Sequence, residues 1–305
     1  MNAMKRSILF LLLGLACAWP AARVHAQSDW LSTPENIEAF RQQVEAMNPA
    51  ASSIELERIE SRSISIDGRD IDIRIYDPGG DTPRPALLYV HGACWVAGSL
   101  DSHDEVSRYL ARNGNALVIA LDYRLAPEHR FPAAHDDVFD TAVWIRDHAD
   151  DLGVDPERLA IGGESAGAHL AAATALRAMD TDGGPDFAFL LLVYAALDGD
   201  GSSWSACKRL YFENAVDARS RYGSPVWVED LSGMPPTFSI YGEHEPVRAE
   251  QELFIRKLRE DGVAVGSFMN PGVGHDVGLW LSVSGDLVAH EAAAGYIRSE
   301  FFDRP

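Results

Sequence analysis

One serine in this chain stands between two glycines in the pattern Gly-x-Ser-x-Gly, at residues 163–167. An apolar run over residues 158–162 precedes it and an alanine-rich stretch from Ala166 to Met179 follows it, which predicts a strand, a tight turn and a helix. In such a turn the glycines let neighbouring backbone approach closely, and the serine Oγ projects outward. The sequence therefore marks Ser165 as a candidate nucleophile.

A serine hydroxyl reacts poorly without a base to take its proton, a carboxylate to orient that base, and donors for a developing oxyanion. Where the serine follows a strand of a parallel sheet, the acid and then the histidine come later in the chain. His275 lies in a glycine-rich loop after the last predicted strand, and we predict that it is the base. His169 and His290 sit in helical patterns, so His244 is the serious alternative.

The candidate acid is Glu245, which comes just after a predicted strand. Catalytic groups gather at the carboxyl ends of strands in open sheets. Pro246 fixes the turn and favours Glu245 over the nearby Glu243, while Asp276 is too close to His275 in sequence to orient it easily. Surface glutamates are usually solvated, so the position after a strand carries this prediction.

Donors for the oxyanion are expected in the loop at residues 91–95, which has the sequence His-Gly-Ala-Cys-Trp and directly follows an apolar run. A loop of small residues can aim backbone N–H groups at a carbonyl oxygen, and the residue after the nucleophile supplies a further donor. We expect the loop at residues 91–95 to supply such N–H groups and Ala166 to supply the third, with His91 and Gly92 supporting the loop.

The remaining pattern predicts the elements that would position these residues. Residues 57–66 and 69–76 alternate apolar and polar side chains around Asp67-Gly68, which indicates a β-hairpin. Continuous apolar runs are typical of buried parallel strands, and they alternate with helical patterns, which predicts an α/β fold: a mostly parallel sheet with helices on both faces. Strands are expected near residues 86–90, 116–121, 158–164, 187–194, 237–241 and 263–268, with helices near 101–113, 132–150, 166–179, 248–261 and 285–301.

Residues 198–233 interrupt this alternation and are rich in aromatic side chains. A surface excursion with its own small core is one interpretation. We favour a lid that excludes water and shapes an apolar pocket. Residues 27–53 hold a predicted amphipathic helix that would form an N-terminal part of this cap, and the main domain is expected to span residues 54–305.

Residues 1–26 are predicted to be a secretory signal, with basic residues near the start, an apolar run at Ile8–Ala18 and a cleavage site after Ala26. The run is about half of the ~20 residues that a membrane span needs, which disfavours an anchor. Lipid attachment at Cys17 is a further alternative, with a poor match to a lipoprotein signal. We therefore expect an exported protein, periplasmic or secreted.

The composition is that of a globular protein, and 305 residues are enough for one large core. A net charge of −20 argues against nucleic acid and anionic membranes as partners. Cys94 and Cys207 would remain after cleavage of the signal and could pair in an oxidising compartment. We expect two separate buried thiols instead, because Cys94 lies in the predicted oxyanion loop and one bridge is no disulfide framework.

Several motifs occur in one order: the loop at residues 91–95, Asp122-Tyr-Arg-Leu-Ala-Pro-Glu128 with Phe131-Pro-Ala-Ala134, the serine motif, and Glu245-Pro-Val-Arg248. Together they resemble the hormone-sensitive-lipase-like (bacterial family IV) branch of the α/β-hydrolases, from about residue 55 to the C-terminus. The resemblance implies a capped α/β-hydrolase fold and hydrolysis of small-molecule carboxylic esters without a metal or organic cofactor. By position it implies Ser165 as nucleophile, Glu245 as acid and His275 as base. The family's oxyanion donors match Ala93 and Cys94, so the resemblance implies that these two residues join Ala166 as donors.

The chain departs from the family pattern in its oxyanion loop, where Ala93 and Cys94 replace two glycines of His-Gly-Gly-Gly-Trp. A backbone N–H does not depend on the side chain, but a positive φ at either position would cost an L-residue on the order of 1–2 kcal/mol. The added Cβ atoms are expected to narrow the acyl pocket and to favour small acyl groups. Glu245 stands where aspartate is more usual, and Ala168 stands where another glycine is common.

Two other functions are open at this stage. An arylformamidase or other amide hydrolase uses a related loop and triad, although a secretory signal argues against a role in cytosolic tryptophan breakdown. A non-catalytic small-molecule-binding protein is the second, since the plant gibberellin receptor resembles this family and lacks the catalytic histidine, which His275 supplies here. We expect no stable membrane insertion and make no prediction of oligomeric state.

Overall fold

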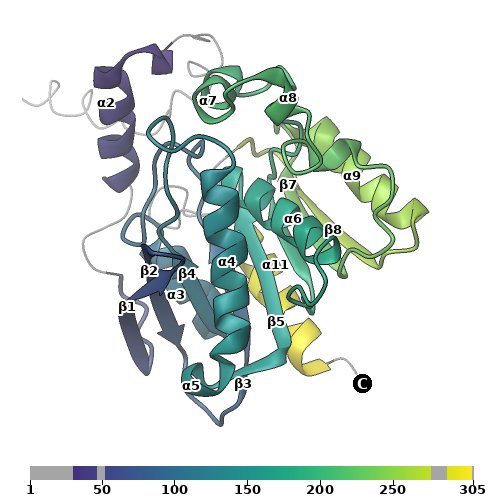
Figure 1. Ribbon diagram of the computed structural model, residues 1–305. Coiled ribbons are helices and arrows are strands. Elements are labelled where there is room, and N and C mark those ends of the chain that lie inside the picture. The colour runs from purple at the N-terminus through teal and green to yellow at the C-terminus, as the bar shows by residue number, and fades with distance from the viewer. Residues whose placement is uncertain (1–29, 47–51, 276–286, 304–305) are drawn as a thin grey trace, which may run out of the picture.

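The computed structural model describes residues 30–46, 52–275 and 287–303, and the predicted signal at residues 1–26 lies outside them. An eight-stranded sheet forms its centre, in the order β1-β2-β4-β3-β5-β6-β7-β8 (Figure 1). β1, β2 and β4 pair antiparallel and the other neighbours pair parallel, as the sequence predicts. The strands are β1 (Arg58–Ile66), β2 (Arg69–Asp77), β3 (Arg84–Val90), β4 (Leu117–Leu121), β5 (Val154–Glu164), β6 (Leu190–Val193), β7 (Thr237–Gly242) and β8 (Val265–Asn270).

The predicted hairpin forms at the edge of the sheet from β1 and β2, with Ile66 opposite Arg69. Its two turn residues, Asp67 and Gly68, have φ of 50° and 80°. Positive φ at both central residues is what a two-residue turn of type I′ requires, and its twist matches that of the flanking strands.

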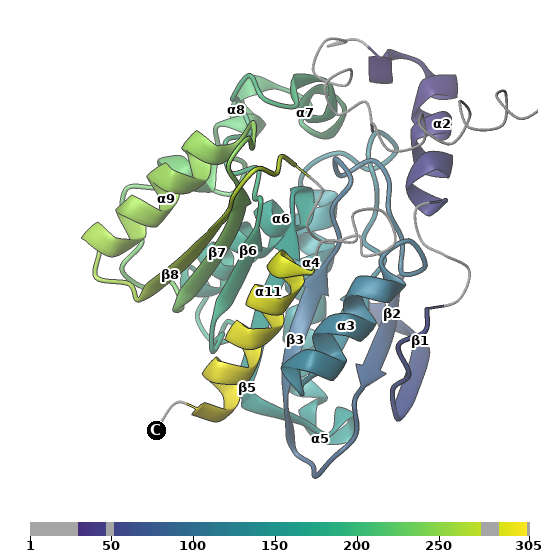
Figure 2. The same cartoon turned by 180° about the vertical axis from the view of Figure 1, so that it is seen from behind.

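Helices cover both faces of the sheet. In Figure 1, α4 and α6 lie in front of it, and Figure 2 shows α3 and α11 on the opposite face. The helices of this main body are α3 (Asp104–Gly114), α4 (Ala133–Asp147), α5 (Ala149–Leu152), α6 (Ala166–Met179), α9 (Arg248–Glu260) and α11 (Val288–Arg298), the last of which continues into a π-helical turn (Ser299–Asp303).

β3 shows why the sheet needs both helical layers. Ala86, Leu88 and Val90 join the core on the side of α4 and α6, whereas Leu87 and Tyr89 join the core on the side of α3 and α11. The two sets alternate because successive side chains of a strand point to opposite faces. Every residue of β3 is buried, and each large apolar side chain stabilises the fold by about 1.5–3 kcal/mol.

Two further segments lie together at one end of the molecule in Figures 1 and 2. One is α2 (Pro34–Glu45), which follows the short 3-10 turn η1 (Trp30–Ser32). The other is the segment predicted to be a lid, residues 198–233, which connects β6 to β7 and contains α7 (Ser205–Tyr211), α8 (Ala215–Ala218) and η2 (Pro225–Trp227). α7 contacts η1, so the two segments meet.

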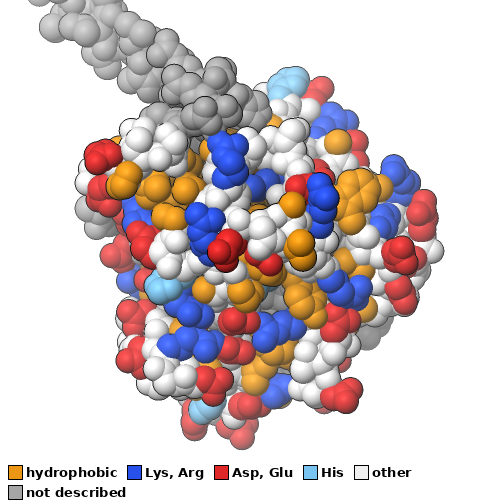
Figure 3. Space-filling view, turned by 45° about the horizontal axis from the view of Figure 1, so that its top comes forward, with side chains coloured by type: hydrophobic (Ala, Val, Ile, Leu, Met, Phe, Trp, Pro, Cys, Tyr) orange, Lys and Arg blue, Asp and Glu red, His pale blue; other side chains and the backbone are white. Residues whose placement is uncertain are grey.

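Acidic and basic side chains are interspersed on the face of the molecule that Figure 3 shows. The absence of a nucleic-acid partner stays a prediction from the net charge. Among the helices of the described ranges, none combines the length and the apolar character needed to cross a bilayer.

The turn between β5 and α6 approaches the end of β3 very closely. A Cβ on Gly163 would meet the carbonyl oxygen of Val90, and a Cβ on Gly167 would meet the carbonyl oxygens of both Val90 and His91. These contacts involve backbone atoms, which cannot move aside as a flexible side chain can. Both glycines are therefore required by the packing of α6 against β3.

Replacing Gly167 with alanine should destabilise the protein by about 1–3 kcal/mol or more, because the added methyl group overpacks this contact. Gly295 in α11 is the matched control, since nothing lies within 4 Å of its Cβ position. Gly295→Ala should leave stability unchanged or raise it by up to about 1 kcal/mol, because alanine favours the helix. Urea unfolding of both variants measures the difference, and equal effects would contradict the packing argument.

Candidate active site

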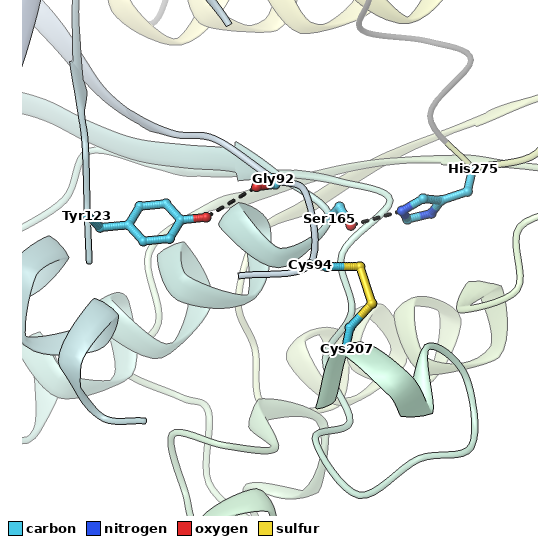
Figure 4. Close-up of a disulfide and its surroundings, with 6 residues drawn as sticks. All are labelled: Gly92, Cys94, Tyr123, Ser165, Cys207 and His275. Atoms are coloured by element: carbon cyan, nitrogen blue, oxygen red, sulfur yellow. Dashed lines mark hydrogen bonds between the residues drawn. A yellow bond between two sulfur atoms is a disulfide. The ribbon is translucent and has the colours of Figure 1, made fainter. Parts of the chain in front are cut away.

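Ser165 occupies a strained turn between β5 and α6. Its φ of 53° and ψ of −117° lie outside the regions that L-residues ordinarily adopt. Its N–H donates to the carbonyl of Val193 in β6 at 2.8 Å, which fixes the turn to the sheet. Such strain, of order 1–3 kcal/mol, persists only where surrounding packing imposes it. The Ser165 side chain is thereby held at the start of α6 and directed toward His275 (Figure 4).

The structure brings the three predicted residues of the triad together. The Oγ of Ser165 lies 2.9 Å from the Nε2 of His275, and the Nδ1 of His275 lies 2.7 Å from Oε1 of Glu245. The Glu245 side chain is 0% exposed and that of His275 is 6% exposed, so the hydrogen bond between them is shielded from water, while Ser165 is half-buried. The N–H of Val247 also donates to Oε1 of Glu245, at 3.3 Å. A proton can therefore pass from Ser165 to an imidazole whose tautomer the carboxylate fixes.

The histidines weighed against His275 lie elsewhere. His169 is buried in α6, where its Nε2 lies 3.0 Å from the carbonyl oxygen of Gly223, and burial lowers its pKa to about 4. His290 is buried in α11. The side chain of His244 is exposed, although its backbone N–H donates to the carbonyl of Val273.

The alternative acids are also placed. Glu243 is exposed, and its carboxylate accepts the N–H of Gly272 at 2.9 Å, which stabilises the loop that carries His275. Asp276 lies outside the described residues. Among the described carboxylates that were weighed as the acid, Glu245 is the one that contacts the imidazole of His275.

Two aromatic rings pack against His275. The ring of Tyr194 lies 4.7 Å from the imidazole and that of Trp204 lies 4.8 Å from it, centroid to centroid. Tyr194 follows β6, whereas Trp204 directly precedes α7 in the predicted lid segment. Neither residue belongs to a motif, and only the fold brings them to the imidazole, so the sequence alone gives no sign of this contact. The segment predicted to be a lid thus forms part of the surroundings of the base.

The loop predicted to bind the oxyanion has three consecutive residues in the left-handed region. Ala93, Cys94 and Trp95 have φ of 70°, 65° and 59°. Each such L-residue costs about 1–2 kcal/mol, so the loop holds a conformation that glycine would adopt more easily. The amides of Ala93, Cys94 and Ala166 find no hydrogen-bond acceptor within the described part of the chain. Those three donors are therefore available to an oxyanion.

His91, which the sequence predicts to support this loop, packs between two rings and contacts the loop backbone. Its ring stacks on those of His103 and Tyr123, and its Nδ1 lies 3.1 Å from the carbonyl oxygen of Gly92. The Tyr123 hydroxyl donates to the carbonyl of His91 or of Gly92, at 3.0 and 3.2 Å (Figure 4). Burial lowers the pKa of His91 to about 4, so its ring is neutral near neutral pH.

Glu164 is a further support that the sequence analysis missed. Its Oε1 accepts the N–H of Gly92 at 2.7 Å and lies 2.8 Å from Nε2 of His103. The carboxylate is buried, and it joins the nucleophile turn to the oxyanion loop. Glu164 occupies an x position of the Gly-x-Ser-x-Gly motif, so the motif does not indicate its role. That role depends on its burial between the ends of β3 and β5, which the sequence alone does not show.

The structure overturns the expectation of two separate thiols, because Cys94 and Cys207 form a disulfide (Figure 4). Their Cα atoms lie 5.3 Å apart, within the 4.4–6.8 Å range that a disulfide spans. The prediction was wrong because it treated a disulfide only as a framework for a small fold. Here α7 lies over the oxyanion loop, and a single bridge links these two segments although 113 residues separate them in the chain.

In the part of the chain that the structure describes, no group of three or more His, Cys, Asp or Glu side chains is arranged to hold a metal ion. The described residues thus offer a half-buried serine, a buried imidazole and a buried carboxylate beside three amides without an acceptor among them.

Comparison with known proteins shows the family to which the chain belongs. Residues 87–279 match the model of a family described by its alpha/beta hydrolase fold. The chain belongs to the α/β-hydrolase family. The predicted fold class and the resemblance to its hormone-sensitive-lipase-like branch are thereby confirmed.

Individual relatives bear esterase names. The carboxylesterase NlhH of Mycobacterium tuberculosis is 35% identical over 239 residues, which cover 72% of this chain and 75% of that protein. An ethyl acetate hydrolase of Pseudomonas putida is 34% identical over 69% of this chain and 72% of its own. The structure of a hyperthermophilic esterase of Pyrobaculum calidifontis has a TM-score of 0.80 and 33% identity, and the match covers 92% of this chain and 98% of that one.

Glu164→Ala should lower kcat about tenfold or more, because the N–H of Gly92 loses its acceptor and the oxyanion loop loosens. Glu164→Gln keeps an oxygen for that N–H and should retain most of the rate. Steady-state ester hydrolysis by both variants, with circular dichroism to check folding, makes the comparison. Equal rates for the alanine and glutamine variants would show that this hydrogen bond does not position the loop.

Proposed function

We propose that this protein is a serine hydrolase that cleaves carboxylic esters through an acyl-enzyme. The observation that carries the proposal is the chain of hydrogen bonds from Ser165 Oγ through His275 to the buried Glu245. The esterase names of its relatives support ester substrates for this chain as well.

In the acylation half, His275 takes the proton of Ser165 as Oγ attacks the ester carbonyl. Glu245 stabilises the imidazolium that forms and holds its orientation. The N–H groups of Ala93, Cys94 and Ala166 bind the carbonyl oxygen as it becomes negative, and the N-terminus of α6 favours that charge. His275 then protonates the leaving alcohol, and the acyl group stays on Ser165.

In the deacylation half, His275 takes a proton from water, and the resulting hydroxide attacks the acyl carbon. The same three N–H groups bind the second oxyanion. Proton transfer from His275 back to Oγ releases the carboxylic acid and restores Ser165. The triad requires no group from outside the chain for either half.

We further infer a preference for small acyl groups. The Cβ atoms of Ala93 and Cys94 add volume to a loop that has glycines in the family pattern, and the bond to Cys207 fills space between that loop and α7. A relative that bears the name ethyl acetate hydrolase supports a small substrate. The disulfide also supports the predicted export, because disulfides persist in oxidising compartments.

Ser165→Ala should lower kcat for p-nitrophenyl acetate by roughly 10⁴-fold or more, because no other group forms the acyl-enzyme. Circular dichroism should show an intact fold. A purified Ser165→Ala protein that retains most of the activity would refute the assignment. If the wild type hydrolyses an N-formylanilide and no ester, the arylformamidase alternative replaces the proposal.

A p-nitrophenyl ester series from acetate to laurate tests the acyl preference. We expect kcat/KM to be highest for acetate or butyrate and to fall about tenfold or more by octanoate, since the pocket cannot take the longer chain without displacing side chains. The Ser165→Ala protein gives the background rate for each ester. Faster hydrolysis of octanoate than of acetate would contradict a narrow acyl pocket.

A further inference from the structure

The two residues that replace glycines in the oxyanion loop each contact a different segment at the capped end. Cys94 is bonded to Cys207 in α7. Ala93 packs in a small apolar cluster with Ala97 and with Phe40 and Val44 of α2. Side chains that glycine lacks therefore join this loop to both α7 and α2.

We propose that Cys207 is a positioning residue for the oxyanion hole, and that its bond to Cys94 keeps the loop in its catalytic conformation. This inference rests on the proposed ester hydrolysis. Cys207 is not proposed to touch the substrate. It acts through Cys94, whose N–H is one of the three proposed donors.

The backbone of the loop explains why an external restraint is needed. L-residues at positive φ relax toward negative φ unless packing prevents it, and that rotation turns the attached peptide planes. The N–H of Cys94 would then leave the direction of the oxyanion. An error of about 1 Å in a catalytic group is enough to lower a rate about a hundredfold.

Hydrogen bonds restrain the loop across Cys94 and on either side of it. The carbonyl of Ala93 accepts the N–H groups of Val96 and Ala97 at 3.2 and 3.1 Å, which closes a turn around Cys94. The Tyr123 hydroxyl contacts the carbonyl oxygens of His91 and Gly92 before it. After it, the carbonyl of Trp95 accepts the N–H of Ala126 at 2.9 Å, and Nε of Arg41 in α2 donates to the carbonyl of Val96 at 2.9 Å. The side chain of Cys94 is held by a covalent bond at the point between these supports.

The partner of Cys94 is itself fixed by contacts that do not involve the disulfide. The ring of Tyr211 stacks on that of Trp95, with centroids 4.9 Å apart and planes 5° from parallel. The N–H of Phe131 donates to the carbonyl of Tyr211 at 2.9 Å, and the Arg130 guanidinium donates to the carbonyl of Arg209 at 3.1 Å. α7 is therefore a rigid anchor, and Cys207 within it is only 3% exposed.

Three proteins separate a positioning role from a merely stabilising one: the wild type, Cys207→Ser and the double variant Cys94→Gly/Cys207→Ser. Both variants lack the disulfide, but only the double variant has a glycine that adopts positive φ without strain. Cys207→Ser should show kcat lowered about tenfold to a hundredfold with KM changed by less than about twofold. The double variant should recover most of kcat, because its loop no longer needs the restraint.

Arg219→Ala is the matched control, since Arg219 pairs with Asp200 on the exposed surface of the same 198–233 segment. It should leave kcat unchanged. If Cys207→Ser does not fold, the folded wild type treated with a phosphine reductant replaces it. Two electrons and two protons convert the disulfide to two thiols, while the phosphine becomes its oxide with oxygen from water.

The outcomes are distinct. Cys207→Ser, or the reduced and folded wild type, with the kcat of the oxidised wild type would overturn the inference. Equal slowing of Cys207→Ser and the double variant would also overturn it, because glycine then restores nothing. If the oxidised wild type has no turnover that depends on Ser165, the proposed function itself fails. That result comes from the untreated wild type, so it is distinguishable from any effect of changing a cysteine.

Discussion

The close approach of the β5–α6 turn to the end of β3 is the constraint on which the site depends. β3 and β5 are parallel neighbours, and Val90 pairs with Gly163 in their register. The chain leaves both strands at the same level of the sheet, so the oxyanion loop after Val90 and the nucleophile turn after Gly163 emerge side by side. Gly163 and Gly167 permit this because a Cβ at either position would meet the Val90 carbonyl. Backbone packing thus positions the proposed donors and the proposed nucleophile before any side chain contributes.

Glu245 and His275, the proposed acid and base, follow two strands in the other half of the sheet, and parallel pairing again brings their loops together. β7 and β8 are parallel neighbours, and Tyr241 and Gly242 pair with Met269 and Asn270 near their carboxyl ends. Glu245 follows the first strand and His275 the second, so both loops reach the edge where Ser165 lies. The N–H of His244 donates to the carbonyl of Val273, which binds the two loops to each other. Three residues from segments that are distant in the chain therefore meet at one edge of the sheet.

Much of this could be predicted because it depends on local signals. The serine motif, the apolar runs and the hairpin turn each specify their own element, and the predicted order of serine, acid and base follows from the parallel sheet. The residues Ser165, Glu245 and His275 were found in this way, and the structure brings them together. The sequence showed only that a positive φ at Ala93 or Cys94 would cost energy. The structure has a positive φ at both residues.

The missed features all depend on packing between segments far apart in the chain. Glu164 holds Gly92 only because β3 and β5 end together, and Trp204 reaches His275 only because the 198–233 segment folds back over the sheet. Two separate thiols were predicted from the small number of cysteines. Whether a disulfide can form depends instead on the position of α7 relative to the loop. No pattern within either segment indicates that distance.

The disulfide also restricts what the predicted lid can do. A lid that opens widely must separate α7 from the body, but α7 is bonded to Cys94, whose neighbour Ala93 packs against α2. Displacing α7 would therefore move a proposed oxyanion donor, and Trp204, just before α7, would leave the imidazole of His275. A glycine in place of Cys94 would adopt the positive φ without strain and would carry no side chain to bond α7. Here the disulfide links the conformation of the loop to the position of α7, so α7 is better described as a fixed cover of the site than as a lid that opens.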